Sequence, residues 1–279
     1  MSVCGKIVAR ISDGEVRMIR NMTKVRAFRS ARGLASGAGR QVPWWGLALL
    51  LLVTQQAFAL EFVPSDFEWS TWPAYCRARY MVSGAGEKSR YAGKIPPVVV
   101  QDWQHKLEPV WYGLHHYCAG IHLFTRAMHE KDRRFALNGF EHSADEASYT
   151  LARSSESHPM FAVMLTLRAR AYFELGHFDD ATADFKRAIQ LHPEVPDSYA
   201  AWGLLLRRSG HLPQAREILE RGIKATDGGT AELHYLLGII LTDMKDYAPA
   251  LEHAKRAYKM GYPLPGLKRK LQNVGHWTD

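Results

Sequence analysis

Residues 115–122 hold the side chains best suited to chemistry, because they bring three histidines and one cysteine together. On a helix, His115, Cys118 and His122 occupy positions i, i+3 and i+7, which lie on one side of the cylinder. Cys76 could add a fourth ligand, and imidazole with thiolate suits tetrahedral zinc or a copper ion. The spacing matches no established zinc motif, and ordinary helical packing also produces it. Metal handling by this cluster is therefore the alternative hypothesis, and a structural pair of cysteines is favoured.

The sequence contains no motif typical of an enzyme. It has no Gly-x-Ser-x-Gly elbow, no glycine-rich phosphate loop and no His-Glu-x-x-His. The adjacent acids Asp179 and Asp180 begin a predicted helix, where they complement the positive end of its dipole. We therefore expect a protein without catalytic residues and without a cofactor.

The segment from Ala162 to Val195 must position much of the chain, and its pattern predicts two amphipathic helices joined at Gly176. In each helix, apolar residues recur at i, i+4 and i+7, one face of a helix with about 3.6 residues per turn. These residues are Leu165, Ala169 and Tyr172 in the first helix and Ala181, Phe185 and Ala188 in the second. The second helix must end before Pro193, because proline cannot continue it.

This segment, residues 162–195, resembles the tetratricopeptide repeat. It has a small residue at position eight, an aromatic at eleven, glycine at fifteen, and then Ala, Phe, Ala and a closing proline. Similar units follow at residues 196–229 and 231–264, although Lys245 stands where the third unit should have glycine. The resemblance implies an all-α fold, a short right-handed solenoid of three full repeats.

The segments next to the repeats are also predicted to be helical. Residues 110–159 indicate a degenerate helix pair, with one helix from about Glu108 to Glu130 and its partner from Phe135 to about Ser154. Residues 265–279 predict a basic C-terminal capping helix, which terminal units of repeat arrays need for solubility.

Residues 60–109 are crowded with aromatic side chains and lack a clear period. A short helix is expected from about Phe67 to Tyr80, capped by Ser65 or Asp66 and interrupted at Pro73. A surface loop is expected to follow, because residues 83–97 are rich in glycine and proline. We expect the whole segment to cover the open end of the helical stack, and an exposed recognition surface is the alternative.

The first 59 residues form a basic leader, with nine Lys and Arg against two acids for a net charge of +7. Because the whole chain has +8, the other 220 residues have only +1, which gives no support for nucleic-acid binding through a basic field. An apolar run from Trp44 to Val53 precedes Ala57-Phe58-Ala59, a pattern typical of signal peptidase cleavage. We predict a secretory signal and a mature chain that begins at Leu60.

Three alternatives for the leader stay open. An uncleaved membrane anchor would extend the apolar run through Leu60. A mitochondrial transit peptide fits the Arg-rich, acid-free stretch at residues 17–40 less well than a signal does. Translation could also begin at Met18 or Met22, since the leader is long for a signal.

The cysteines agree with export. Cys4 would leave with the leader, so that Cys76 and Cys118 remain, and a pair in an oxidising compartment is most simply a disulfide. Tyr75-Cys76 together with the His115–Cys118 stretch resembles a combination found in exported bacterial tetratricopeptide proteins of unassigned function. We therefore expect a periplasmic protein if the source is bacterial.

The resemblance also implies where a partner would bind. In tetratricopeptide arrays the first helix of each pair lines a concave face, with contacts at positions two, five, nine, twelve and thirteen. The residues singled out are Arg170, Phe173, Glu174, Arg207, Arg208, Tyr235 and Asp243. The arginines could bind an acidic or C-terminal carboxylate feature, or they could simply be solvated. The leading hypothesis is an exported, non-enzymatic scaffold that binds a protein or peptide in this groove, with envelope or secretion-complex assembly as the expected setting.

Overall fold

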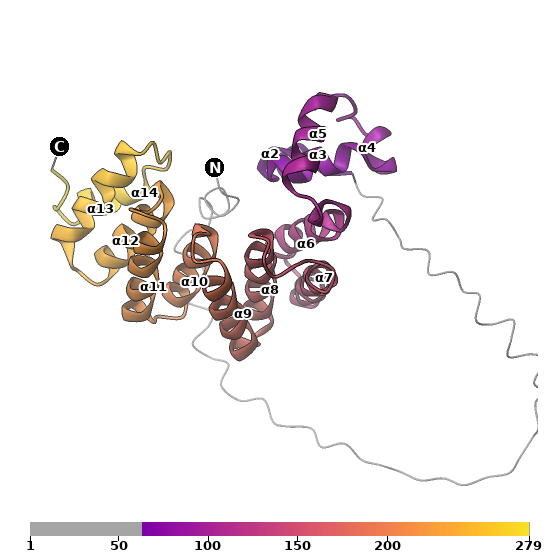
Figure 1. The fold of residues 1–279 in the computed structure, drawn as a ribbon. Coiled ribbons are helices and arrows are strands. Elements are labelled where there is room, and N and C mark those ends of the chain that lie inside the picture. The colour runs from indigo at the N-terminus through magenta and orange to yellow at the C-terminus, as the bar shows by residue number, and fades with distance from the viewer. Residues whose placement is uncertain (1–62, 279) are drawn as a thin grey trace, which may run out of the picture. The chain divides into compact units, whose positions relative to one another are not determined.

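The computed structural model describes residues 63–278, and this part of the chain contains helices and no strand (Figure 1). The predicted all-α fold class is confirmed. The predicted leader, its cleavage after Ala59 and the alternative membrane anchor lie outside the described residues. Within residues 63–278, none of the helices combines the length and apolar character needed to cross a bilayer.

Each of the three predicted repeats contains one pair of helices, and neighbouring helices pack against each other along the array (Figure 1). The pairs are α8 (Met160–Leu175) with α9 (Phe178–Leu191), α10 (Pro196–Arg208) with α11 (Leu212–Ala225), and α12 (Ala231–Asp243) with α13 (Tyr247–Lys259). Between α8 and α9, Gly176 has a φ of +84°, a left-handed conformation that glycine adopts without a steric penalty. Lys245 also has a positive φ, of +64°, so the third repeat makes its turn without the expected glycine.

Helices also flank the repeats. The predicted degenerate pair consists of α6 (Leu114–Ala127) and α7 (Arg133–Leu151), and α7 packs on α8. The helix expected from Glu108 is interrupted, because a 3₁₀ turn, η4 (Val110–Tyr112), and Gly113 precede α6. At the other end α14 (Gly266–Asn273) packs on α12 and α13, as a cap should.

The N-terminal segment contains four helices: α2 (Asp66–Thr71), α3 (Ala74–Met81), α4 (Gly84–Glu87) and α5 (Pro97–Lys106). Ser65 caps α2 in a reciprocal capping box with Glu68, and Pro73 separates α2 from α3 as expected. The surface loop expected over residues 83–97 contains the short α4. Helix α5 was not predicted, because consecutive prolines and valines favour extended structure.

Two contacts fasten this segment to the repeats through α6. Cys76 of α3 and Cys118 of α6 form the predicted disulfide, with their Cα atoms 5.5 Å apart. Glu68, which is 6% exposed, accepts a 2.8 Å hydrogen bond from Nε of Arg126. Burial alone would raise the pKa of Glu68. The hydrogen bonds from Arg126 and Ser65 outweigh this effect and lower the pKa to about 2, so the carboxylate stays charged and paired.

We expect the Phe185→Ala substitution to lower the free energy of unfolding by about 3–5 kcal/mol. Phe185 is 1% exposed and stacks on Trp202 of the next repeat, so its removal opens a cavity between repeats. Phe178→Ala, in the same helix, is the matched control because Phe178 is 57% exposed. Urea denaturation measures both, and equal losses for the two variants would contradict this packing.

Candidate functional site

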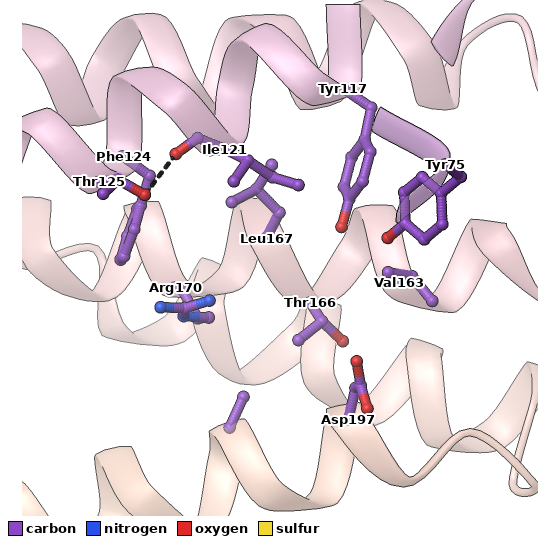
Figure 2. A pocket seen from close by; sticks show the side chains of 11 residues that line it. Tyr75, Tyr117, Ile121, Phe124, Thr125, Val163, Thr166, Leu167, Arg170 and Asp197 are labelled. Atoms are coloured by element: carbon purple, nitrogen blue, oxygen red, sulfur yellow. Dashed lines mark hydrogen bonds between the residues drawn. The ribbon is translucent and has the colours of Figure 1, made fainter. Parts of the chain in front are cut away.

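A cleft lies where α3, α6, α8 and α10 meet (Figure 2), and we call it the Arg170 cleft. Its walls combine apolar side chains with a few polar groups. The residues are Tyr75, Tyr117, Ile121, Phe124, Thr125, Val163, Thr166, Leu167, Arg170, Asp197 and Ala201. Its enclosed volume is about 40 Å³, so one small group or about one water molecule fits inside and anything larger must lie across its mouth.

Arg170 is the predicted groove residue that opens into this cleft. Its guanidinium lies 4.3 Å from the centroid of the Phe124 ring, in cation–π geometry. Among the residues that the structure describes, Arg170 forms no ion pair with a carboxylate. The half-buried guanidinium therefore keeps its hydrogen-bond donors for a group that enters the cleft.

Two tyrosines supply polar groups to the other end of the cleft. In Figure 2 the hydroxyls of Tyr75 and Tyr117 point toward the side where Thr166 and Asp197 lie. Burial raises the pKa of both tyrosines above the usual value, and the Asp197 charge adds to the rise, so both hydroxyls stay protonated. This end of the cleft can both donate and accept hydrogen bonds.

The disulfide positions these tyrosines. Tyr75 directly precedes Cys76 in α3, and Tyr117 directly precedes Cys118 in α6. Because the bond holds these two helices together, it also holds the two rings, whose centroids lie 6.4 Å apart. Neither tyrosine was predicted as a binding residue, although both belong to the Tyr75-Cys76 and His115–Cys118 combination on which the resemblance rests.

Four other predicted contact residues form ion pairs with the neighbouring repeat. Arg208 Nη1 of α10 lies 2.5 Å from Glu174 Oε1 of α8, and Arg207 Nε lies 2.6 Å from Asp243 Oδ2 of α12. Asp243 also pairs with Lys270 of α14. The structure thus brings these residues together, but as charges that neutralise one another. Their role as partner contacts stays a prediction.

Phe173 and Tyr235 differ in their surroundings. The Arg208 guanidinium lies 5.5 Å from the centroid of the Phe173 ring, so Phe173 belongs to the same inter-repeat contact. Tyr235 is only 5% exposed and stacks on Tyr262 at 4.1 Å. The expectation that Tyr235 projects into an open groove is wrong, because the chain after α13 returns and covers its ring.

A second, larger cavity of about 300 Å³ lies between the first and second repeats. It is mainly apolar and shares no residue with the Arg170 cleft. Its walls are Phe173, Phe178, Ala181, Thr182, Phe185, Trp202, Leu205, Leu206, Ser209 and His211. Phe185 was predicted on the apolar face of its helix, but this hollow beside it was not predicted.

The histidine cluster is not arranged as a metal site. Cys118 is oxidised in the disulfide, and His115 Nδ1 lies 3.0 Å from the Tyr112 carbonyl. Burial and the Arg126 charge lower the pKa of His122 to about 4, and its Nδ1 lies 3.3 Å from Glu68 Oε1. Nowhere in residues 63–278 do three or more His, Cys, Asp or Glu side chains come together as metal ligands. The arrangement gives no support to the metal-handling alternative.

We expect the Arg207–Asp243 pair to contribute a coupling free energy of about 0.5–1 kcal/mol in a double-mutant cycle of Arg207→Ala and Asp243→Ala. Both side chains are partly buried, at 32% and 20% exposure, so water screens the pair only in part. The same cycle on Arg134 and Asp132 is the control, since those side chains are 87% and 39% exposed. Urea denaturation supplies the four free energies of unfolding, and no coupling at Arg207–Asp243 would contradict its role between repeats.

The comparison with known proteins agrees with this arrangement of paired helices. A family model of the tetratricopeptide repeat matches residues 172–240, from the end of α8 to the last turn of α12. No curated protein matches the chain. The repeated helix pairs, the left-handed turn at Gly176 and the family match together show that residues 172–240 of this chain are formed by tetratricopeptide repeats.

Proposed function

We propose that this protein is a non-enzymatic scaffold that binds an extended segment of a protein partner across the Arg170 cleft. Tetratricopeptide repeats generally mediate interactions between proteins, and residues 172–240 match that family. The observation that carries the proposal is Arg170, a half-buried cation without a carboxylate partner among the described residues, at a cleft. Partial burial of such a cation costs solvation free energy, and hydrogen bonds from a bound partner would recover it.

The walls of the cleft determine what the partner segment must offer. A carboxylate or a backbone carbonyl would accept hydrogen bonds from Arg170, which has five donors in a planar fork. Apolar side chains of the segment would pack on Ile121, Val163 and Leu167. Amide groups of the segment would pair with the hydroxyls of Tyr75 and Tyr117. The small enclosed volume favours a segment that lies along the surface and inserts one group.

Arg207 and Arg208 each form an ion pair with a carboxylate of a neighbouring repeat, which bears on where an acidic group of the partner would bind. Both guanidiniums already have carboxylate partners, so an acidic segment would have to displace Asp243 or Glu174 before binding there. Displacing a pair of this kind gains little net free energy, because one ion pair replaces another. Arg170 is therefore the arginine through which an acidic group of the partner would bind.

We expect the Arg170→Glu substitution to weaken partner binding tens- to thousands-fold, which corresponds to about 2–5 kcal/mol. The reversal removes a donor from a partly desolvated site and repels an acidic group. Peptides are selected from a displayed random library with the processed wild-type chain, and their dissociation constants are then measured for wild type and variant. Circular dichroism checks that the variant keeps its helices.

Arg269→Glu is the matched control, because Arg269 is an exposed arginine of α14, outside the cleft. It should bind the selected peptides as tightly as wild type. If Arg170→Glu and Arg269→Glu bind them equally well, the binding surface lies elsewhere on the array.

We also propose that the protein is exported through the leader that the sequence predicts. The Cys76–Cys118 disulfide supports this, because disulfides persist in oxidising compartments and are rare in reducing ones. Both cysteines are buried, at 0% and 5% exposure, and they fasten the N-terminal segment to α6. Export would therefore also supply the oxidation that holds Tyr75 beside Tyr117.

N-terminal sequencing of the protein from its native compartment should give Leu60 as the first residue. The small residues at positions 57 and 59 motivate this cleavage site. Intact mass measured before and after reduction should differ by about 2 Da, the two hydrogens of one reduced disulfide. A chain that keeps Trp44 to Val53 would mean a membrane anchor instead.

A further inference from the structure

Two histidines of the third repeat face each other at hydrogen-bond distance. His234 of α12 is completely buried, and its Nδ1 lies 2.8 Å from Nδ1 of His253 on α13. The other ring nitrogen of His234, Nε2, lies 2.8 Å from the carbonyl oxygen of Gly228. The two rings stack with their centroids 5.0 Å apart.

The Gly228 carbonyl fixes the protons of the neutral pair. A carbonyl oxygen only accepts hydrogen bonds, so Nε2 of His234 donates. Its Nδ1 is then unprotonated and accepts a hydrogen bond from Nδ1 of His253. One added proton is compatible with this contact, on either ring, because one nitrogen between the rings still accepts. Two added protons are not, because two N–H groups would then face each other at 2.8 Å.

The pair sits at the connection between the second and third repeats. Asp227, Gly228 and Gly229 all have positive φ, and they link α11 to α12 where the repeat signature has a closing proline. His234 of α12 forms a hydrogen bond with the Gly228 carbonyl in this turn, and His253 of α13 forms a hydrogen bond with His234. The pair thus fastens the turn to both helices of the third repeat.

The charged groups around the pair do not cancel the conflict between two protons. Glu252 of α13 and Glu220 of α11 favour a cation on His253, whereas Arg256 of α13 opposes protonation of both rings. Burial lowers the pKa of His234 and of His253, and burial is the largest cause at each. A histidine whose pKa is lowered in the folded state contributes to stability when the pH is above its ordinary pKa. This contribution is lost as the pH falls from the ordinary pKa through the lowered one.

We propose that His234 and His253 form an acid-sensitive latch, which closes the third repeat onto the turn at 227–229 near neutral pH and releases it in mild acid. Protonation of both rings breaks the hydrogen bond between His234 and His253, which links α12 to α13, and frees the turn. Arg207 and Asp243 pair across the same junction of repeats, so release would also loosen the predicted contact face at that end.

Hydrogen exchange measured by mass spectrometry tests the latch in the whole chain that remains after the leader is removed. Opening constants for peptides of α12 and α13 are measured from pH 7.5 to 5.0 and corrected for intrinsic exchange. Below about pH 6.5 the constant should rise about tenfold per pH unit for each extra proton that the open state binds. In H253Q this rise should shrink by up to about thirtyfold, one proton fewer over about 1.5 pH units, because the amide can donate to His234 but cannot become a cation. An unchanged rise in H253Q would overturn the proposal.

One control variant and an NMR titration complete the test. H142Q, at an exposed histidine of α7, should keep the wild-type pH dependence. If H253Q does not fold, the ring nitrogens of His234 and His253 are titrated in the wild-type protein by NMR. The latch requires that at most one ring is protonated while the α12 and α13 amides remain protected. Protected amides with both rings protonated would refute it.

Discussion

The close approach of neighbouring helices is the constraint on which this structure depends, and small residues make it possible. A Cβ atom at Gly203 would lie 2.7 Å from Cγ of Leu219, and one at Gly222 would lie 2.7 Å from Cβ of Tyr199. At Gly238 it would lie 2.5 Å from Leu267. Real Cβ contacts are essentially never shorter than 3.0 Å, so a side chain at Gly222 would press on the Cβ of Tyr199 and push α10 and α11 apart. At Gly203 and Gly238 the side chains of Leu219 and Leu267 would have to move. Burial of the facing large side chains then supplies the stabilising free energy.

The polar contacts follow from this spacing. Because α8, α10 and α12 approach each other closely, Glu174 reaches Arg208 and Arg207 reaches Asp243 across successive repeats. At the N-terminal end the disulfide and the Glu68–Arg126 pair bring α2 and α3 onto α6, so that Tyr75 can complete a cleft whose floor belongs to the repeats. Backbone packing thus decides which charges neutralise one another and leaves Arg170 to face the cleft.

The sequence predicted those features that depend on local periodicity. Helix pairs, their turns and the cysteine pair each need only spacing or composition, and Gly176 marked its turn correctly. Arg170 faces the cleft because its repeat position fixes its direction, whereas ion pairs between repeats depend on how two helices sit side by side. The role of Arg170 as a partner contact stays a prediction. Tyr235 failed for a related reason, since a segment 27 residues further on, at Tyr262, covers it. The α5 helix was missed because packing against α3 outweighs its valine-rich sequence.

Site-specific photo-cross-linking would test the central claim most directly, that a partner lies across the Arg170 cleft. A photoreactive phenylalanine analogue replaces Val163, in the cleft wall, or Phe135, which is 66% exposed on α7. The protein is irradiated with a peptide selected on the wild-type chain, and the adducts are mapped by mass spectrometry. We expect a covalent adduct from position 163 and none from position 135. An adduct from position 135 with none from position 163 would contradict the account.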